Sequence, residues 1–155
     1  MPQLHQTRRA LLASATALLT AAALPHLALA AEPRIFAEGG IAINGTDPVA
    51  YFTQGAPVVG KPEFSAEYMG ATWHFISAEN RDRFRDAPEE FAPQFGGYCA
   101  YAAAKGYVAP TQPDAWTIYE DKLYLNANLR ARELWSQDIP GHITRANANW
   151  PGILD

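Results

Sequence analysis

The chain has 155 residues, with 12 lysines and arginines against 16 aspartates and glutamates, which gives a formal charge of −4. Its length suits one domain, and a composition that is 48% hydrophobic and 18% charged is that of a globular rather than a disordered protein. The mild acidity argues against a nucleic-acid partner, and the single cysteine excludes an internal disulfide and the paired thiolates of a zinc finger.

Residues 1–30 have the pattern of an export signal. Arg8-Arg9 precedes the uncharged Ala/Leu-rich segment 10–24, and residues 28–30 have the small-x-small pattern of a cleavage site. The apolar segment is shorter than the roughly 20 residues that a bilayer span needs. The paired arginines indicate a twin-arginine signal, with an ordinary secretory signal as the alternative. Cleavage there predicts a periplasmic mature protein, residues 31–155, with no transmembrane segment.

The first half of the mature chain predicts short elements with clear boundaries. Asp47 is a good helix N-cap and Pro48 suits the first helical position, which predicts a helical turn at 49–53 after a short strand at 41–44. Alternating apolar residues predict a hairpin of strands 64–68 and 71–77 with its turn at Met69-Gly70. Ser77 then caps a helix over 78–86, and a second short helix begins at Pro88.

The second half predicts one more hairpin and more helix. Gly96-Gly97 interrupts the chain, residues 98–105 form an Ala-rich helix ended by Gly106, and strands 115–119 and 122–125 pair around Glu120-Asp121. The tail is predicted to be helical over 129–143, with a break at Pro140-Gly141. Because strand pairs alternate with helices without a regular βαβ pattern, the sequence predicts a small single α+β domain with two β-hairpins and several short helices.

One stretch resembles the YHS domain. The run from Tyr68 to Ser77, with Phe84, Pro88 and Phe91 after it, has that family's spacing of turn, strand, cap and helix, and Asp47-Pro48-Val49 is similar to its usual opening. The runs 96–102, 141–143 and 149–151 resemble a longer exported subfamily, in which some members carry selenocysteine where Cys99 stands. The resemblance implies a YHS-like domain with a C-terminal extension over residues 31–155, and a function in handling metals.

The resemblance is incomplete at the positions where metal-handling YHS domains commonly carry thiols. These positions follow the Asp-Pro-Val opening, precede the serine cap, and lie three residues after it. They are occupied here by Ala50, Ile76 and Asn80. Binding of a soft metal through that site is therefore not implied for this chain.

Cys99 is the residue on which any chemistry is predicted to depend. It follows Gly96-Gly97 and opens a predicted helix, where backbone N–H groups favour an anion. A cysteine so placed is expected to be partly thiolate, the form that attacks electrophiles and binds metals, and the glycines would let the backbone approach a ligand closely. The alternative is a buried cysteine that acts as a small hydrophobic residue.

His74 and His142 are the candidate partners of Cys99. His74 lies within a predicted strand, where a backbone carbonyl commonly satisfies the imidazole, whereas His142 opens the last helix as an exposed donor. A thiolate with one or two imidazoles would hold a copper or zinc ion, and the softness of the thiolate favours copper. No ligand spacing in the sequence requires this set.

Three functions remain open. The first is an exported metal-handling protein, for copper above all, or a redox accessory protein, centred on Cys99 and acting on a metal ion or a small redox substrate. The second is a thiol or selenol-type enzyme that reduces peroxides with Cys99, which would need an external thiol because the chain has no second cysteine. The third is an interaction module without chemistry. The sequence names no protein partner.

Overall fold

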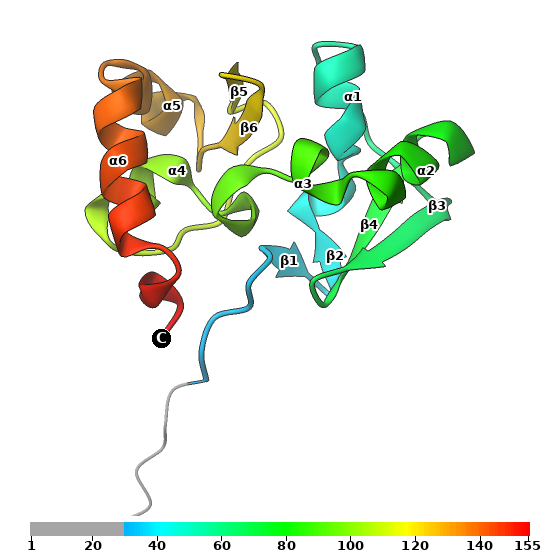
Figure 1. The fold of residues 1–155 in the computed structure, drawn as a ribbon, viewed down its shortest axis with the longest axis horizontal. Helices are drawn as coiled ribbons and strands as arrows, with labels where there is room; N and C mark the ends of the chain where they lie inside the picture. The colour runs from blue at the N-terminus through cyan, green and yellow to red at the C-terminus, as the bar shows by residue number, and fades with distance from the viewer. Residues whose placement is uncertain (1–29) are drawn as a thin grey trace, which may run out of the picture.

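Two β-sheets and six α-helices make up residues 30–155, the part of the chain that this computed structural model describes (Figure 1). The larger sheet has the strand order β1-β2-β4-β3, and the smaller sheet is the hairpin β5-β6. The predicted α+β domain with two hairpins is confirmed, whereas the predicted export signal lies outside the described residues except for Ala30. The strands are β1 (Ala37–Glu38), β2 (Ile41–Ala42), β3 (Lys61–Tyr68), β4 (Ala71–Phe75), β5 (Trp116–Tyr119) and β6 (Lys122–Leu125); the helices are α1 (Pro48–Thr53), α2 (Ala78–Asp86), α3 (Pro88–Phe91), α4 (Ala100–Lys105), α5 (Leu129–Ser136) and α6 (Ile139–Asn149).

The larger sheet is built on the antiparallel hairpin β3–β4. Tyr68 pairs with Ala71 across a turn in which Met69 and Gly70 both have positive φ, 49° and 82°. Two central residues in this region give a turn whose twist matches that of the strands. The predicted first hairpin and its turn are therefore confirmed.

β2 lies beside β4 as a parallel neighbour, with Ile41 opposite Thr72. The predicted strand 41–44 ends earlier, at Ala42. Ile43 and Asn44 take positive φ, 42° and 59°, so the chain leaves the sheet at this point in a 3₁₀ turn. The turn leads the chain toward the cap of α1.

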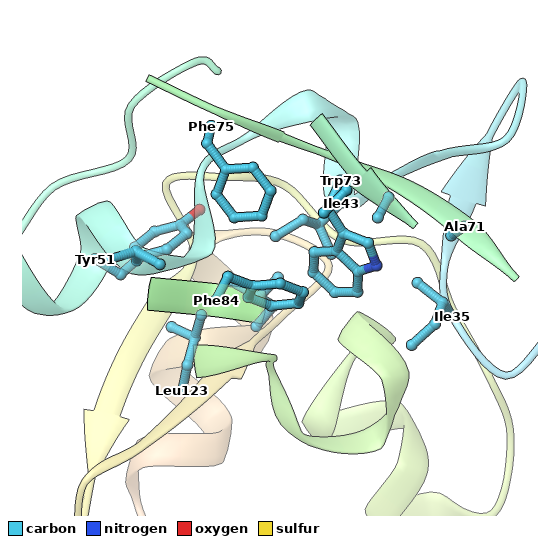
Figure 2. Packing of buried hydrophobic residues seen from close by; sticks show 12 residues of the cluster. Ile35, Ile43, Tyr51, Ala71, Trp73, Phe75, Phe84 and Leu123 are labelled. Atoms are coloured by element: carbon cyan, nitrogen blue, oxygen red, sulfur yellow. The ribbon is translucent and has the colours of Figure 1, made fainter. Parts of the chain in front are cut away.

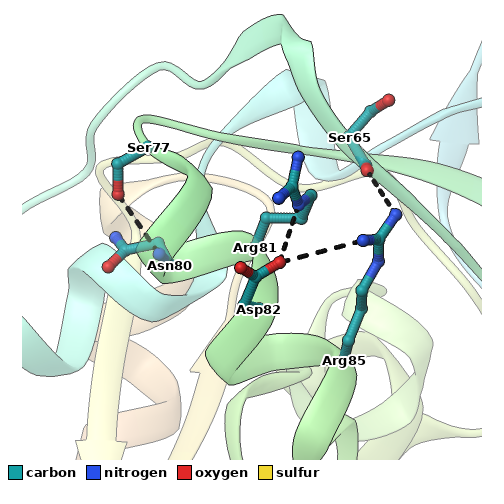
Figure 3. Close-up of polar contacts among 6 residues, drawn as sticks. All are labelled: Ser65, Ser77, Asn80, Arg81, Asp82 and Arg85. Carbon is teal, nitrogen blue, oxygen red and sulfur yellow. Dashed lines mark hydrogen bonds and ion pairs between the residues drawn. The ribbon is translucent and has the colours of Figure 1, made fainter.

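α2 begins at the predicted cap and carries its charges on an exposed face (Figure 3). The Ser77 hydroxyl accepts the Asn80 backbone N–H at 3.2 Å. Arg81 and Arg85 flank the Asp82 carboxylate, and the hydrogen bond from Arg81 holds the pKa of Asp82 below its usual value. Exposed ion pairs of this kind contribute little to stability, so the helix depends on its cap and its buried face.

The second half of the chain forms α4, the β5–β6 hairpin and the two C-terminal helices. The helix predicted at 98–105 begins at Ala100, because Cys99 occupies the N-cap, and it ends as predicted at Gly106, whose φ is 92°. Glu120 and Asp121 form the turn of the second hairpin, also as predicted, and both have positive φ.

The C-terminal helices divide at a different place from the one the sequence predicts. The break lies at Gln137 and Asp138, and Pro140 belongs to the first turn of α6. The Asp138 carboxylate accepts the Gly141 N–H at 3.1 Å and so begins the second helix. Proline fits a first helical turn because its missing N–H is not needed there. The predicted break at Pro140-Gly141 is therefore wrong.

Strand β6 lies between two hydrophobic clusters. Leu123 and Leu125 point into the cluster formed with the large sheet, whereas Tyr124 points into the cluster formed by α4, α5 and α6. This alternation follows from the two-residue period of a strand. Figure 1 shows the same arrangement, with the large sheet and α1–α3 on one side of the hairpin and α4–α6 on the other.

Phe84 is the centre of the first cluster (Figure 2). It is 1% exposed, and its ring centroid lies 5.1 Å from that of Trp73 and 5.1 Å from that of Phe75. The sequence predicts Trp73 and Phe84 as the residues that anchor the hairpin to the following helix, and this is confirmed. None of the helices within residues 30–155 has the length and apolar character needed to cross a membrane.

Candidate functional site

The Asp47 carboxylate is fully buried and joins three elements. Its Oδ1 accepts the N–H groups of Val49 at 2.8 Å and Ala50 at 3.2 Å, which caps α1 as predicted. Its Oδ2 accepts the N–H of Ile76 at 2.9 Å and Nδ2 of Asn80 at 2.8 Å, which the sequence does not predict. Four neutral donors thus replace the water that the carboxylate loses on burial.

Cys99 is the N-cap of α4, and its side chain is turned inward. The residue is 2% exposed, its Sγ accepts the Ala102 N–H at 3.4 Å, and its thiol donates to Oδ1 of Asn126 at 3.5 Å. The Cys99 N–H donates to the Ala109 carbonyl at 3.0 Å. The predicted place at a helix start is confirmed, and the thiol is buried there as a hydrogen-bonded group.

Asn126 is the residue of this site that sequence reasoning missed. It follows β6, is fully buried, and its Oδ1 also accepts the Tyr101 N–H at 3.0 Å. That bond fixes the orientation of the amide, because a reversed amide would set Nδ2 against a second donor. Nδ2 has no hydrogen-bond partner among residues 30–155. The sequence feature that could have indicated Asn126 is its place, as a polar residue, directly after the apolar end of a predicted strand.

The glycine pair before Cys99 allows other segments of the chain to lie close to its backbone. A Cβ on Gly96, whose φ is 62°, would collide with the Arg34 carbonyl, and a Cβ on Gly97 would meet the Ile43 side chain at 2.5 Å. The Phe36 N–H donates to the Gly96 carbonyl at 2.9 Å. The space that these glycines were expected to leave for a ligand is taken by segment 34–36 at Gly96 and by the Ile43 side chain at Gly97.

His142 lies in the first turn of α6, at the predicted start of the last helix. Its Nδ1 is 2.8 Å from the Asp138 carbonyl and 3.0 Å from the Trp135 carbonyl. Since both neighbours only accept, Nδ1 carries the hydrogen and Nε2 keeps the lone pair that would bind a metal. The imidazole stacks edge-on against Tyr101, with ring centroids 5.3 Å apart. Within residues 30–155, Tyr101 links His142 to the Asn126 amide, and no hydrogen bond joins His142 to Cys99.

His74 lies in the large sheet, away from the helices that carry the other two candidates. It is half-buried on β4, opposite Ser65, beside a shallow hollow that Glu38 and Asn44 also line. Figure 1 shows β4 and α4 on opposite sides of the β5–β6 hairpin. Across residues 30–155, no group of three or more His, Cys, Asp and Glu side chains is arranged to hold a metal. The structure thus does not bring Cys99, His74 and His142 together as one such group.

Tyr98, directly before Cys99, has the packing role that the sequence favours. It is buried against Phe36 and Trp150, and its hydroxyl donates to the Pro33 carbonyl at 2.9 Å. Burial raises the pKa of Tyr98, and the charge of Glu32 raises it further. The phenol therefore stays neutral near pH 7 and supplies no anionic ligand.

The family model of the YHS domain matches residues 49–95, the stretch from α1 to the turn before Gly96. Residues 49–95 are a YHS domain. This confirms the resemblance carried by the hairpin, its cap and its helix. YHS domains are associated with the handling of metals, copper in particular. No curated protein and no solved structure gives a significant match to the chain.

The YHS domain of this chain does not fit a soft metal at the family's usual thiol positions. The three positions are Ala50, Ile76 and Asn80, and all three donate an N–H to Asp47. The backbones of the first two and the side chain of the third thus meet at the Asp47 carboxylate, and none of the three side chains offers a thiolate. Cys99 lies just beyond the matched residues.

Proposed function

We propose that this chain is an exported accessory protein of metal or redox chemistry and that the Cys99 thiol is its working group. The observation that carries the proposal is the buried polar setting of that thiol. Cys99 is the single cysteine, it caps α4, and it is held between an N–H donor and the Asn126 amide. A cysteine that served only as a small hydrophobic residue would need no such partners.

Metal handling is supported by the association of the YHS domain with copper and by the chemistry of the thiolate. A soft ligand favours copper(I) over zinc. His142 offers Nε2 as a second ligand, because carbonyl groups already engage its Nδ1. His74, from the large sheet, is the weaker candidate because it lies among different elements.

A copper(I) titration under reducing conditions tests the metal proposal. The mature protein is expected to take one copper(I) ion from a chromogenic chelator, and Cys99→Ser is expected to take none. Serine suits the comparison because it is a good N-cap and keeps the hydrogen bond to Asn126. His142→Ala is expected to weaken binding by about 10–100-fold, and His74→Ala is the matched control that leaves it unchanged. Equal binding by Cys99→Ser would contradict the proposal.

A thiol peroxidase is the second candidate, and the free Nδ2 of Asn126 favours it. A buried N–H donor without a partner suits a bound oxygen atom, whereas it repels a cation. Turnover of hydrogen peroxide with an external thiol, measured beside Cys99→Ser, tests this candidate. If the wild type neither binds copper nor turns over peroxide, the third function, an interaction module without chemistry, is the one that remains.

Export through the twin-arginine route forms part of the proposal and rests on residues 1–30. Replacement of Arg8 and Arg9 by lysine is expected to leave the precursor in the cytoplasm, since that route depends on the paired arginines. Cell fractionation and the mass of the mature chain, expected to begin at Ala31, provide the measurement. Normal export of the double variant would indicate an ordinary secretory signal instead.

A further inference from the structure

The Asn126 amide contacts the sulfur of Cys99 through Oδ1 and carries a second polar atom, Nδ2, that is unused in the described part of the chain. Its Oδ1 lies 3.5 Å from Sγ and 3.0 Å from the Tyr101 nitrogen, and the residue is fully buried. Nδ2 belongs to the same planar amide and has no partner among residues 30–155. Buried donors without a partner are uncommon in proteins, and such a group is available to a water molecule or a ligand.

The atom that would use this donor is an acceptor attached to Sγ. The thiol in its resting state already donates to Oδ1 and accepts from Ala102, so its own hydrogen bonds are complete. A metal ion on Sγ offers no lone pair to an N–H group. An oxygen bound to Sγ carries lone pairs and lies one covalent bond from the sulfur, which the Asn126 amide contacts.

We propose that Asn126 is the positioning residue of Cys99 and that its Nδ2–H group binds the oxygen of a Cys99 sulfenate formed from a small hydroperoxide. The inference rests on the proposed function, because it takes Cys99 as the working group. It deepens that function by assigning Asn126 a role in the reaction of Cys99 with a small hydroperoxide. Cys99 is 2% exposed, so a small hydroperoxide suits it better than a bulky one.

The chemistry balances with one peroxide and two external thiols. The Cys99 thiolate attacks one peroxide oxygen, an S–O bond forms, the O–O bond breaks, and the leaving hydroxide takes a proton and becomes water. Sulfur is oxidised and the peroxide is reduced. One external thiol then condenses with the sulfenic acid and releases water, and a second displaces the mixed disulfide, which regenerates Cys99 and yields an external disulfide.

The test measures sulfenate formation on the folded mature protein. Hydrogen peroxide is added, the sulfenic acid is trapped with a cyclic 1,3-diketone, and the adduct is counted by mass spectrometry over time. Asn126→Asp keeps an acceptor for Tyr101 and for the thiol, removes the donor and adds a like charge. Because a like charge within 4–6 Å disfavours an anion, the rate at pH 7 is expected to fall about tenfold or more.

Two comparisons separate this role from a merely structural one. Lowering the pH protonates the carboxylate introduced by Asn126→Asp and restores an O–H donor, so the ratio of wild-type to variant rate is expected to shrink toward one. Asn149→Ala is the matched control. The Asn149 amide, in α6, donates to the Ala103 carbonyl of α4, the helix that Cys99 caps, at 2.8 Å. It is expected to react at the wild-type rate.

Each outcome points to one conclusion. If Cys99 of the folded wild type forms no sulfenate, the redox function and this inference both fail. If the wild type reacts and Asn126→Asp reacts equally fast, or if Asn149→Ala is slowed as much, the role of Asn126 alone is overturned. If circular dichroism shows that Asn126→Asp is unfolded, Asn126→Ser replaces it. Serine is neutral and too short to reach the oxygen, so the same slowing is expected.

Discussion

Asp47→Ala is expected to lower the free energy of unfolding by at least about 4 kcal/mol, since each of four donors left without an acceptor costs about 1–3 kcal/mol. The variant removes the acceptor for four N–H groups at once, including those of Ile76 and Asn80. It also removes the cap of α1. Urea unfolding followed by circular dichroism measures the change.

Asp82→Ala is the matched control for this prediction. Asp82 lies on the exposed face of α2 and bonds only the neighbouring arginines among residues 30–155. Its removal is expected to change stability by no more than about 0.5 kcal/mol. If Asp47→Ala costs as little as this control, the carboxylate does not hold α1, β4 and α2 together.

Phe84→Ala is expected to destabilise the fold by about 3–5 kcal/mol, the range for a large aromatic side chain removed from a closed core. Phe84 touches the rings of Trp73 and Phe75 and packs edge-on against Tyr68. The cavity would therefore open between the hairpin and α2, in the middle of the cluster that Figure 2 shows. Thermal and urea unfolding provide the measurement.

Phe91→Ala offers a matched comparison, because Phe91 is only half-buried and packs edge-on against Phe52. It is expected to lower the free energy of unfolding by clearly less than Phe84→Ala does. Equal losses at the two positions would show that the centre of the cluster is not where the ring contacts place it.

Local signals in the sequence predicted the elements that depend on neighbouring residues. Asp47, Ser77 and Gly106 mark helix ends through contacts within a few residues, and each hairpin turn contains one residue, Gly70 or Asp121, of a type that tolerates positive φ. The tail was predicted less well because Pro140 suits both a helix end and a first helical turn. The Asp138 cap decides between them, and its effect depends on side-chain geometry.

The candidate site could be predicted only in part, for the same physical reason. The place of Cys99 at a helix start is local and was predicted, whereas its contact with Asn126 joins residues far apart in the sequence. Likewise Asp47 was predicted as a cap, but its bonds to Ile76 and Asn80 depend on how α1 meets β4 and α2. Pairings across the fold leave no periodic pattern in a single sequence.

The segment that follows the predicted signal finds its partners far along the chain. The Glu32 N–H donates to the Leu154 carbonyl at 2.6 Å, and segment 34–36 packs on Gly96. During synthesis Glu32 emerges early and Leu154 long after it, so segment 34–36 gains its partner when Gly96 has emerged, but Glu32 stays without this partner until Leu154 has left the ribosome. Docking of Glu32 therefore distinguishes a finished chain from an unfinished one at the residues directly after the predicted signal.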